Sequence, residues 1–126
     1  MSELLKKADA FVLELFKKEL DDKFVYHNYT HTKRVVKSTQ EIIDNTEISV
    51  KDEKALLLAA WLHDTGYTVD EDNHEEESCK IAEQFLKKHN QDQEIIDQVN
   101  KLIMATKFKD KPEGKLEEII RDADAS

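Results

Sequence analysis

An uninterrupted apolar segment sets the tightest limit on how this chain can fold. The eight residues Ala55–Leu62 (ALLLAAWL) contain no polar side chain, and a helix that is apolar on every side has to be buried against other elements. His63 and Asp64 follow directly, and Thr65-Gly66 then ends the predicted helix. An imidazole and a carboxylate at the end of a buried helix need a partner or a metal ion, because burying charge is costly. The segment therefore predicts a central helix with a polar site at its C-terminal end.

The rest of the chain also has the pattern of helices. Only two glycines and one proline occur in 126 residues, which leaves little material for hairpin turns. Apolar residues recur at helical spacing in five further segments, which are Leu4–Leu15, Val35–Ile43, Cys79–Leu86, Ile95–Ile103 and Leu116–Ala123. We predict an all-α, compact bundle of about six helices that forms a single domain over residues 1–126.

Capping residues and chain breaks predict several helix ends. Ser49 with Asp52 resembles a capping box that opens the central helix. Asn73 is a candidate N-cap for the next helix, whose first turn carries three consecutive glutamates. An acidic loop is expected from about Tyr67 to Asn73, and the segment 111–114 (KPEG) breaks the chain before the last helix.

Charge and composition narrow the classes of partner. The chain has 28 acidic and 19 basic residues, for a formal net charge of -9, which disfavours binding to nucleic acid polymers and to anionic membrane surfaces. The one cysteine, Cys79, rules out an internal disulfide and is expected to be a small packed side chain. We find neither a signal peptide nor an apolar run long enough to span a bilayer. These features predict a cytoplasmic, soluble protein.

Four of the five histidines are candidates for chemistry. His27 and His31 are spaced i, i+4 and can serve one site from one face of a helix. His63 and His74 flank the turn after the central helix, whereas His89 lies at a solvent-exposed helix end and is given no role. Together with Asp64 and an acidic pair near the C-terminus, these histidines supply enough nitrogen and oxygen ligands for a divalent cation in a helical bundle.

Four motifs in order, YHNYTHTKRVV, LLLAAWLHDTGY, NHEEES and IIRDADAS, resemble the HD superfamily of metal-dependent phosphohydrolases, and most closely its small bacterial predicted hydrolases. The resemblance covers nearly the whole chain. It implies one divalent metal ion held by His31, His63, Asp64 and a late acidic residue. A helical wheel puts Asp122 and Asp124 on opposite edges of the last helix and does not choose between them; the resemblance favours Asp124.

The resemblance also implies roles in catalysis. His27 matches a Y-H-N-x-x-H pattern of cyclic-nucleotide phosphodiesterases, in which this histidine protonates the leaving oxygen; an orienting role is the alternative. His74 lies where two-metal members supply a second-metal ligand, but the segment 104–107 (MATK) lacks the histidine those members add. This departure favours one metal, with His74 and Glu75 contacting the substrate or a water, and with Lys107 neutralising a phosphate oxygen.

The predicted function is therefore the metal-dependent hydrolysis of a phosphoester, which we expect to be a nucleotide or cyclic nucleotide, with Asp64 accepting a proton. The ligand set suits Mn, Fe, Co, Ni, Zn and, less comfortably, Mg. A catalytically weak HD-type module that binds metal or nucleotide is the alternative, and a plain helical interaction module is a third interpretation. The chain stops two residues after Asp124, so a truncated domain is also expected; a homodimer is left open.

Overall fold

Six α-helices and one 3₁₀ helix make up the computed structural model, which describes residues 2–107 and 111–125 and has no strand in that part. The predicted all-α bundle is thereby confirmed. The elements are α1 (Glu3–Glu19), α2 (Asp22–Asp44), α3 (Val50–Leu62), η1 (Thr65–Thr68), α4 (His74–Lys88), α5 (Gln93–Ala105) and α6 (Lys115–Ala125). The chain end at Ser126, on which the expectation of a truncated domain depends, lies outside the described residues.

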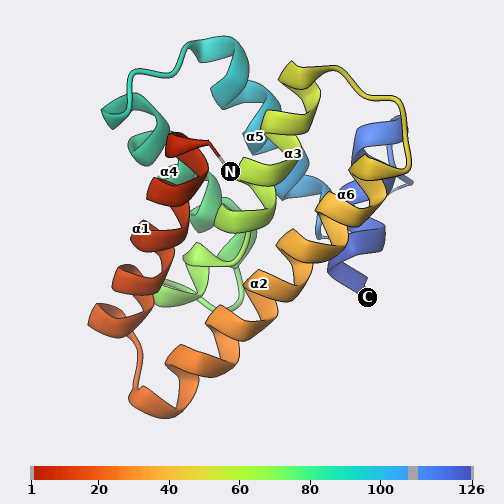
Figure 1. Ribbon diagram of the computed structural model, residues 1–126. Helices are drawn as coiled ribbons and strands as arrows, with labels where there is room; N and C mark the ends of the chain where they lie inside the picture. Colours follow the sequence, from red (N-terminus) through yellow and green to blue (C-terminus); the bar gives the residue numbers. More distant parts are fainter. Residues whose placement is uncertain (1, 108–110, 126) are drawn as a thin grey trace.

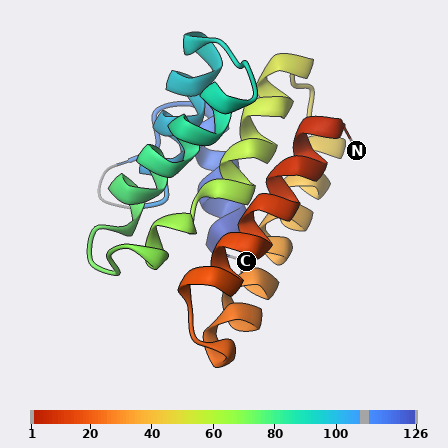
Figure 2. The same ribbon diagram turned by 90° about the vertical axis from the view of Figure 1, so that its left-hand side faces the viewer.

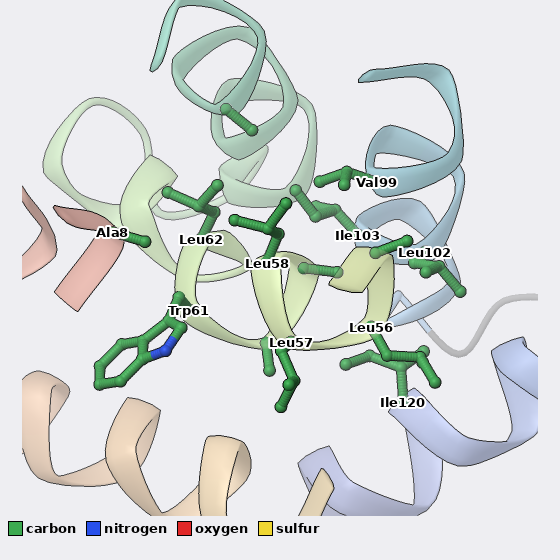
Figure 3. Close-up of a cluster of buried hydrophobic side chains, with 14 of the residues drawn as sticks. Ala8, Leu56, Leu57, Leu58, Trp61, Leu62, Val99, Leu102, Ile103 and Ile120 are labelled. Atoms are coloured by element: carbon green, nitrogen blue, oxygen red, sulfur yellow. The ribbon is translucent and has the colours of Figure 1, made fainter. Parts of the chain in front are cut away.

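The apolar segment forms the centre of the bundle, as its composition predicts. All eight residues of Ala55–Leu62 are buried, and α3 contacts each of the other five α-helices (Figure 1). Its side chains leave in several directions: Leu56 points toward Ile120 of α6, and Leu58 toward Ile103 of α5 (Figure 3). A helix that meets neighbours on every side has no polar face, because no side of it reaches water.

The longest helix, α2, runs along the outside of the core. It follows α1 after a two-residue connection, and the two helices lie antiparallel and side by side (Figures 1 and 2). Its buried residues recur at helical spacing, from Val25 through Thr32, Val35 and Thr39 to Ile43. This buried stripe fixes which face of α2 is turned toward the core, and His31 stands beside it.

The predicted helix ends are confirmed in part. Ser49 caps α3, because its hydroxyl accepts a hydrogen bond from the Asp52 N–H at 3.1 Å. The reciprocal half of a capping box is absent from this end, since the Asp52 carboxylate accepts from the Gln98 amide of α5 at 2.7 Å. Asn73 occupies the N-cap position of α4, but its side chain makes no capping bond and donates to Asp70.

The connection between α3 and α4 begins with a short helix and continues as a loop. The predicted irregular segment from Tyr67 to Asn73 is confirmed for residues 69–73, but its first two residues belong to the 3₁₀ helix η1, whose residues Thr65 and Gly66 are buried. The reason is tertiary: η1 packs closely against α4. Separately, no helix in the described ranges is both long and apolar enough to cross a membrane.

Candidate metal centre

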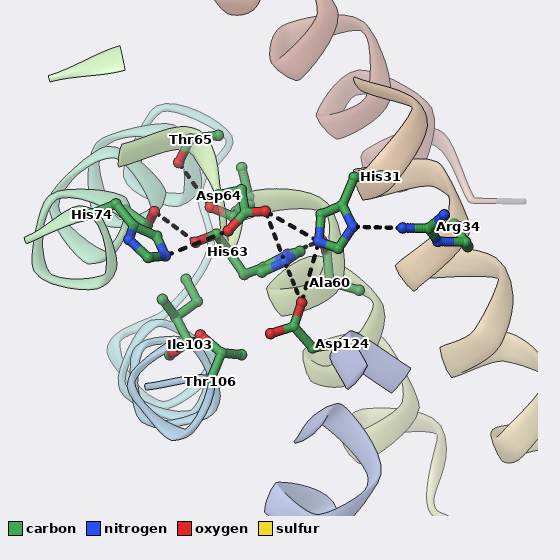
Figure 4. Close-up of polar contacts among 12 residues, drawn as sticks. His31, Arg34, Ala60, His63, Asp64, Thr65, His74, Ile103, Thr106 and Asp124 are labelled. Atoms are coloured by element: carbon green, nitrogen blue, oxygen red, sulfur yellow. Dashed lines mark hydrogen bonds and ion pairs between the residues drawn. The ribbon is translucent and has the colours of Figure 1, made fainter. Parts of the chain in front are cut away.

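Three helices bring four predicted ligands to one place. His31 comes from the middle of α2, His63 is the C-cap of α3 with Asp64 next to it, and Asp124 lies in the last turn of α6. Figure 4 shows the two imidazoles and the two carboxylates turned toward one another. His63 is 1% exposed and the Asp64 side chain 9%, whereas the side chains of Asp124 and His31 are 16% and 27% exposed. The cluster is therefore buried on the side of His63 and Asp64 and more accessible to solvent on the side of His31 and Asp124.

The distances fit a shared cation for His31, His63 and Asp124, whose ligand atoms all lie within 4.8 Å of one another. Asp64 is close to both histidines but does not belong to that group of three. Asp64 Oδ2 lies 3.2 Å from His63 Nε2 and 3.4 Å from His31 Nε2, and Asp124 Oδ1 lies 3.1 and 3.3 Å from the same two nitrogens. Ligand atoms that surround one ion at about 2.1 Å are about 3.0 to 3.4 Å apart in octahedral or tetrahedral geometry. Two imidazole nitrogens with carboxylate oxygens are also a donor set that divalent transition metals accept.

His63 is held for coordination by its own helix. Its Nδ1 lies 2.7 Å from the Ala60 carbonyl oxygen, which only accepts, so Nδ1 carries a proton and Nε2 is the nitrogen that faces the carboxylates. Burial alone would lower the pKa of His63, but Asp64 and Asp124 together raise it. Burial would likewise raise the pKa of Asp124, but hydrogen bonds from His31 and His63 lower it. Without a cation, the cluster keeps a proton on His63 between two carboxylates.

His31 has a different outer partner. Arg34 Nη2 donates to His31 Nδ1 at 3.1 Å, since a guanidinium has no acceptor. A neutral His31 then carries its proton on Nε2, toward the carboxylates. A cation bound at Nε2 requires that proton to move to Nδ1, so the Arg34 contact has to open when His31 acts as a ligand.

The turn that aims Asp64 is built by residues to which the sequence analysis gave no role. Ser78 of α4 is fully buried, and its hydroxyl donates to the His63 carbonyl at 2.7 Å and accepts from the Gly66 N–H at 2.8 Å. Thr65 Oγ1 donates to the Leu62 carbonyl at 2.7 Å. A Cβ at Gly66 would collide with the His74 carbonyl and lie 2.6 Å from the Ser78 nitrogen. The sequence offered one signal for Ser78: it lies four residues before Ala82, on the face of α4 that is buried in the core.

His74 contacts Asp64 from the side opposite the cluster (Figure 4). Its Nε2 lies 3.6 Å from Asp64 Oδ1 and 3.1 Å from Glu75 Oε2. The ring stacks on Tyr67, with centroids 3.9 Å apart, and its Nδ1 lies 3.2 Å from the Glu71 carbonyl oxygen. These four neighbours hold the imidazole against the second oxygen of Asp64, where it can orient that carboxylate.

His27 lies at a pocket that opens beside the cluster. The pocket has a volume of about 530 Å³, and His27 is exposed one helical turn before His31. Its walls come from the α1–α2 connection, the first turns of α2 and the segment after α3, and they comprise Leu20, Phe24, His27, Asn28, His31, Asp64, Tyr67 and Glu71. Phe24, Asn28, Tyr67 and Glu71 are pocket residues to which the sequence analysis gave no role.

Two further predicted residues lie outside the cluster. Asp122 is exposed and lines a different hollow, beside Ile42 of α2, while Asp124 reaches the two histidines. Lys107 forms an ion pair with Glu76, with Nζ to Oε2 at 2.6 Å, and this hydrogen bond raises its pKa. It is not among the residues that line the pocket at the cluster. A phosphate contact by Lys107 would thus have to compete with Glu76.

Comparison with known families places this geometry in context. The family model of the HD domain matches residues 28–126, a range that contains His31, His63, Asp64 and Asp124. No curated protein and no solved structure matches the chain.

Proposed function

Because the chain belongs to the HD-domain family, we propose that it hydrolyses a phosphoester bond with the help of one divalent metal ion. HD domains belong to a superfamily of metal-dependent phosphohydrolases. The observation that carries the proposal is the convergence of two imidazole nitrogens and two carboxylate oxygens from α2, α6 and the end of α3, with each nitrogen 3.1 to 3.4 Å from each oxygen. The substrate is a nucleotide or a cyclic nucleotide.

The residues that would hold the metal are His31, His63, Asp64 and Asp124. His63 offers Nε2 because Ala60 holds its other nitrogen. When bound, a divalent ion polarises a phosphoryl oxygen and lowers the pKa of a water molecule. Mn, Fe, Co, Ni and Zn suit this mixture of nitrogen and oxygen donors, and Mg suits it less well.

The remaining steps belong to side chains around the ligands. Asp64 accepts the proton of the attacking water, and His74 with Glu75 keeps the carboxylate oriented from behind. His27, exposed at the pocket, donates a proton to the leaving oxygen, because an imidazolium can act as a general acid. Lys107 neutralises a phosphate oxygen once it leaves Glu76.

Elemental analysis of the purified protein tests the metal site. We expect about one transition metal per chain in the wild type and its loss in His63→Ala. Asp124→Asn, at the more open side of the cluster, is a second variant that retains the size of the side chain. His89→Ala is the matched control, because His89 caps the far end of α4 and packs on Phe85.

A panel of phosphoesters, assayed with the metal found, tests the activity. Turnover that disappears in His63→Ala and persists in His89→Ala supports the proposal, and turnover in a metal-free variant would overturn it. A protein that binds metal but turns over no phosphoester is instead an HD-type binding module. A protein that holds no metal even after reconstitution, and whose melting temperature the metal does not change, would exclude both the hydrolase and the metal-binding module.

A further inference from the structure

The pocket beside the cluster has one apolar wall. Leu20 ends α1, and Phe24 lies in the first turn of α2 with 46% of its surface exposed, which is unusual for a phenylalanine. Tyr67 contributes a second aromatic ring from η1. A hollow of about 530 Å³ with these rings has room for a flat apolar group next to the metal ligands.

The charged groups of the same pocket are acidic. Among the residues that the structure describes, its lining includes the acidic residues Asp64 and Glu71 and no lysine or arginine. The part of the pocket beside Glu71 is therefore a poor place for additional negative charge.

Three cations of α2 are close in sequence; none is among the described residues that line the pocket, although Lys23 and Arg34 each contact a residue that does. The Lys23 ammonium lies 5.0 Å from the centroid of the Phe24 ring, and the Lys33 ammonium lies 5.2 Å from that of Tyr29. Arg34 binds the outer nitrogen of His31. Sites that hold polyphosphates use clustered lysines, arginines or helix N-termini, and no such cluster lines this pocket.

We propose that the pocket selects monophosphate esters whose other part is an aromatic or apolar group, and that Glu71 disfavours chains of several phosphates. This proposal rests on the proposed function, since the metal cluster has to receive the single phosphate. Phe24 supplies the surface against which the aromatic group packs. Glu71 lines the pocket, so its negative charge would repel the second and third phosphates of a chain that extends into the pocket, while a monophosphate stays at the cluster.

Charge reversal at Glu71 is the direct test. Its backbone carbonyl is the group that contacts His74, so Glu71→Lys changes the pocket charge without removing that contact. Glu3→Lys is the control: it changes the net charge by the same amount at the start of α1, away from the pocket, where the Glu3 side chain is 82% exposed. The measured quantity is kcat/KM for AMP and ATP at saturating Mn²⁺, or Kd by calorimetry when no turnover occurs.

We expect the wild type to prefer AMP over ATP at least tenfold, and Glu71→Lys to reduce this ratio at least fivefold, while Glu3→Lys leaves it unchanged. Phe24→Ala should lower kcat/KM, or the affinity, at least tenfold for p-nitrophenyl phosphate and much less for glycerol 3-phosphate, which has no ring. Equal preference for ATP, or a ratio insensitive to Glu71→Lys, would overturn the inference.

The same measurements separate this inference from the proposed function. Turnover with no preference between AMP and ATP would support the hydrolase function and refute the selection for monophosphates. If the protein binds AMP in preference to ATP, and Glu71→Lys reduces this preference, but no phosphoester is turned over, the selection is supported and the hydrolase function is refuted.

Discussion

Ser78→Ala tests whether the turn after α3 depends on one buried hydroxyl. That hydroxyl donates to the His63 carbonyl and accepts from the Gly66 N–H, at 2.7 and 2.8 Å, and Ser78 is 0% exposed. Alanine fits the site but leaves one carbonyl and one N–H without these partners. Each unsatisfied buried group costs about 1 to 3 kcal/mol, so for the two groups together we expect the free energy of unfolding to fall by about 2 to 6 kcal/mol.

Urea denaturation, followed by the fluorescence of Trp61 and by circular dichroism, measures this change. Trp61 is the only tryptophan and is 4% exposed, so its emission reports the opening of the core. A chelator keeps metal binding from adding to the stability of either protein. At roughly 4 °C for each kcal/mol in a domain of this size, the melting temperature should fall by about 8 to 24 °C.

Ser49→Ala is the matched control, because it removes the single capping bond of an exposed serine. That change should cost about 1 kcal/mol. If Ser78→Ala costs no more than Ser49→Ala, with the same dependence on urea, the two buried bonds do not support the turn and the reasoning is wrong.

Three other perturbations have defined outcomes. Gly66→Ala should destabilise the domain by about 1 to 3 kcal/mol in the same urea assay, because its Cβ meets the backbone of α4; an unchanged midpoint would contradict this. The Tyr29 hydroxyl donates a hydrogen bond to Asp9 at 2.5 Å, and the pKa of Tyr29 is raised, mainly by burial, to about 12. The protonated hydroxyl therefore contributes fully to the stability of the folded state below pH 10, and this contribution is lost as the pH rises toward 12. The difference in unfolding free energy between the wild type and Tyr29→Phe should shrink over that interval. Because the pKa of His63 is raised, metal should displace its proton and bind more tightly as the pH rises from 6 to 8, with proton release detectable by calorimetry in buffers of different ionisation enthalpy; equal affinity at both pH values would refute this.

Periodicity and composition were sufficient for the helical class and for the identity of the core helix. Ala55–Leu62 could only be stable inside a bundle, and it is buried throughout. The Ser49 cap was also predictable, because a capping bond joins residues three apart in the chain. Such features are local, so the order of residues contains the information needed to predict them.

The connection after α3 shows where local rules stop. Its acidic residues indicated a loop and do lie in irregular chain, but Thr65–Thr68, which include no acidic residue, form a 3₁₀ helix. Ser78, twelve residues after Gly66, binds the backbone there. The serine itself carried only a weak signal. A hydroxyl on an apolar helical face does not reveal which distant carbonyl it meets.

The site divides in the same way. The resemblance to the HD superfamily nominated His31, His63 and Asp64 and favoured Asp124, whereas a helical wheel left Asp122 and Asp124 equivalent. Only the packing of α6 beside α2 and α3 turns Asp124 toward the histidines, 61 residues along the chain from His63, and leaves Asp122 exposed. Likewise, the pairing of Lys107 with Glu76 and the acidic pocket wall at Glu71 depend on how separate helices meet. Helix formation is governed by near neighbours in the chain, whereas the convergence of side chains depends on the rotation and crossing of packed helices, which no local pattern specifies.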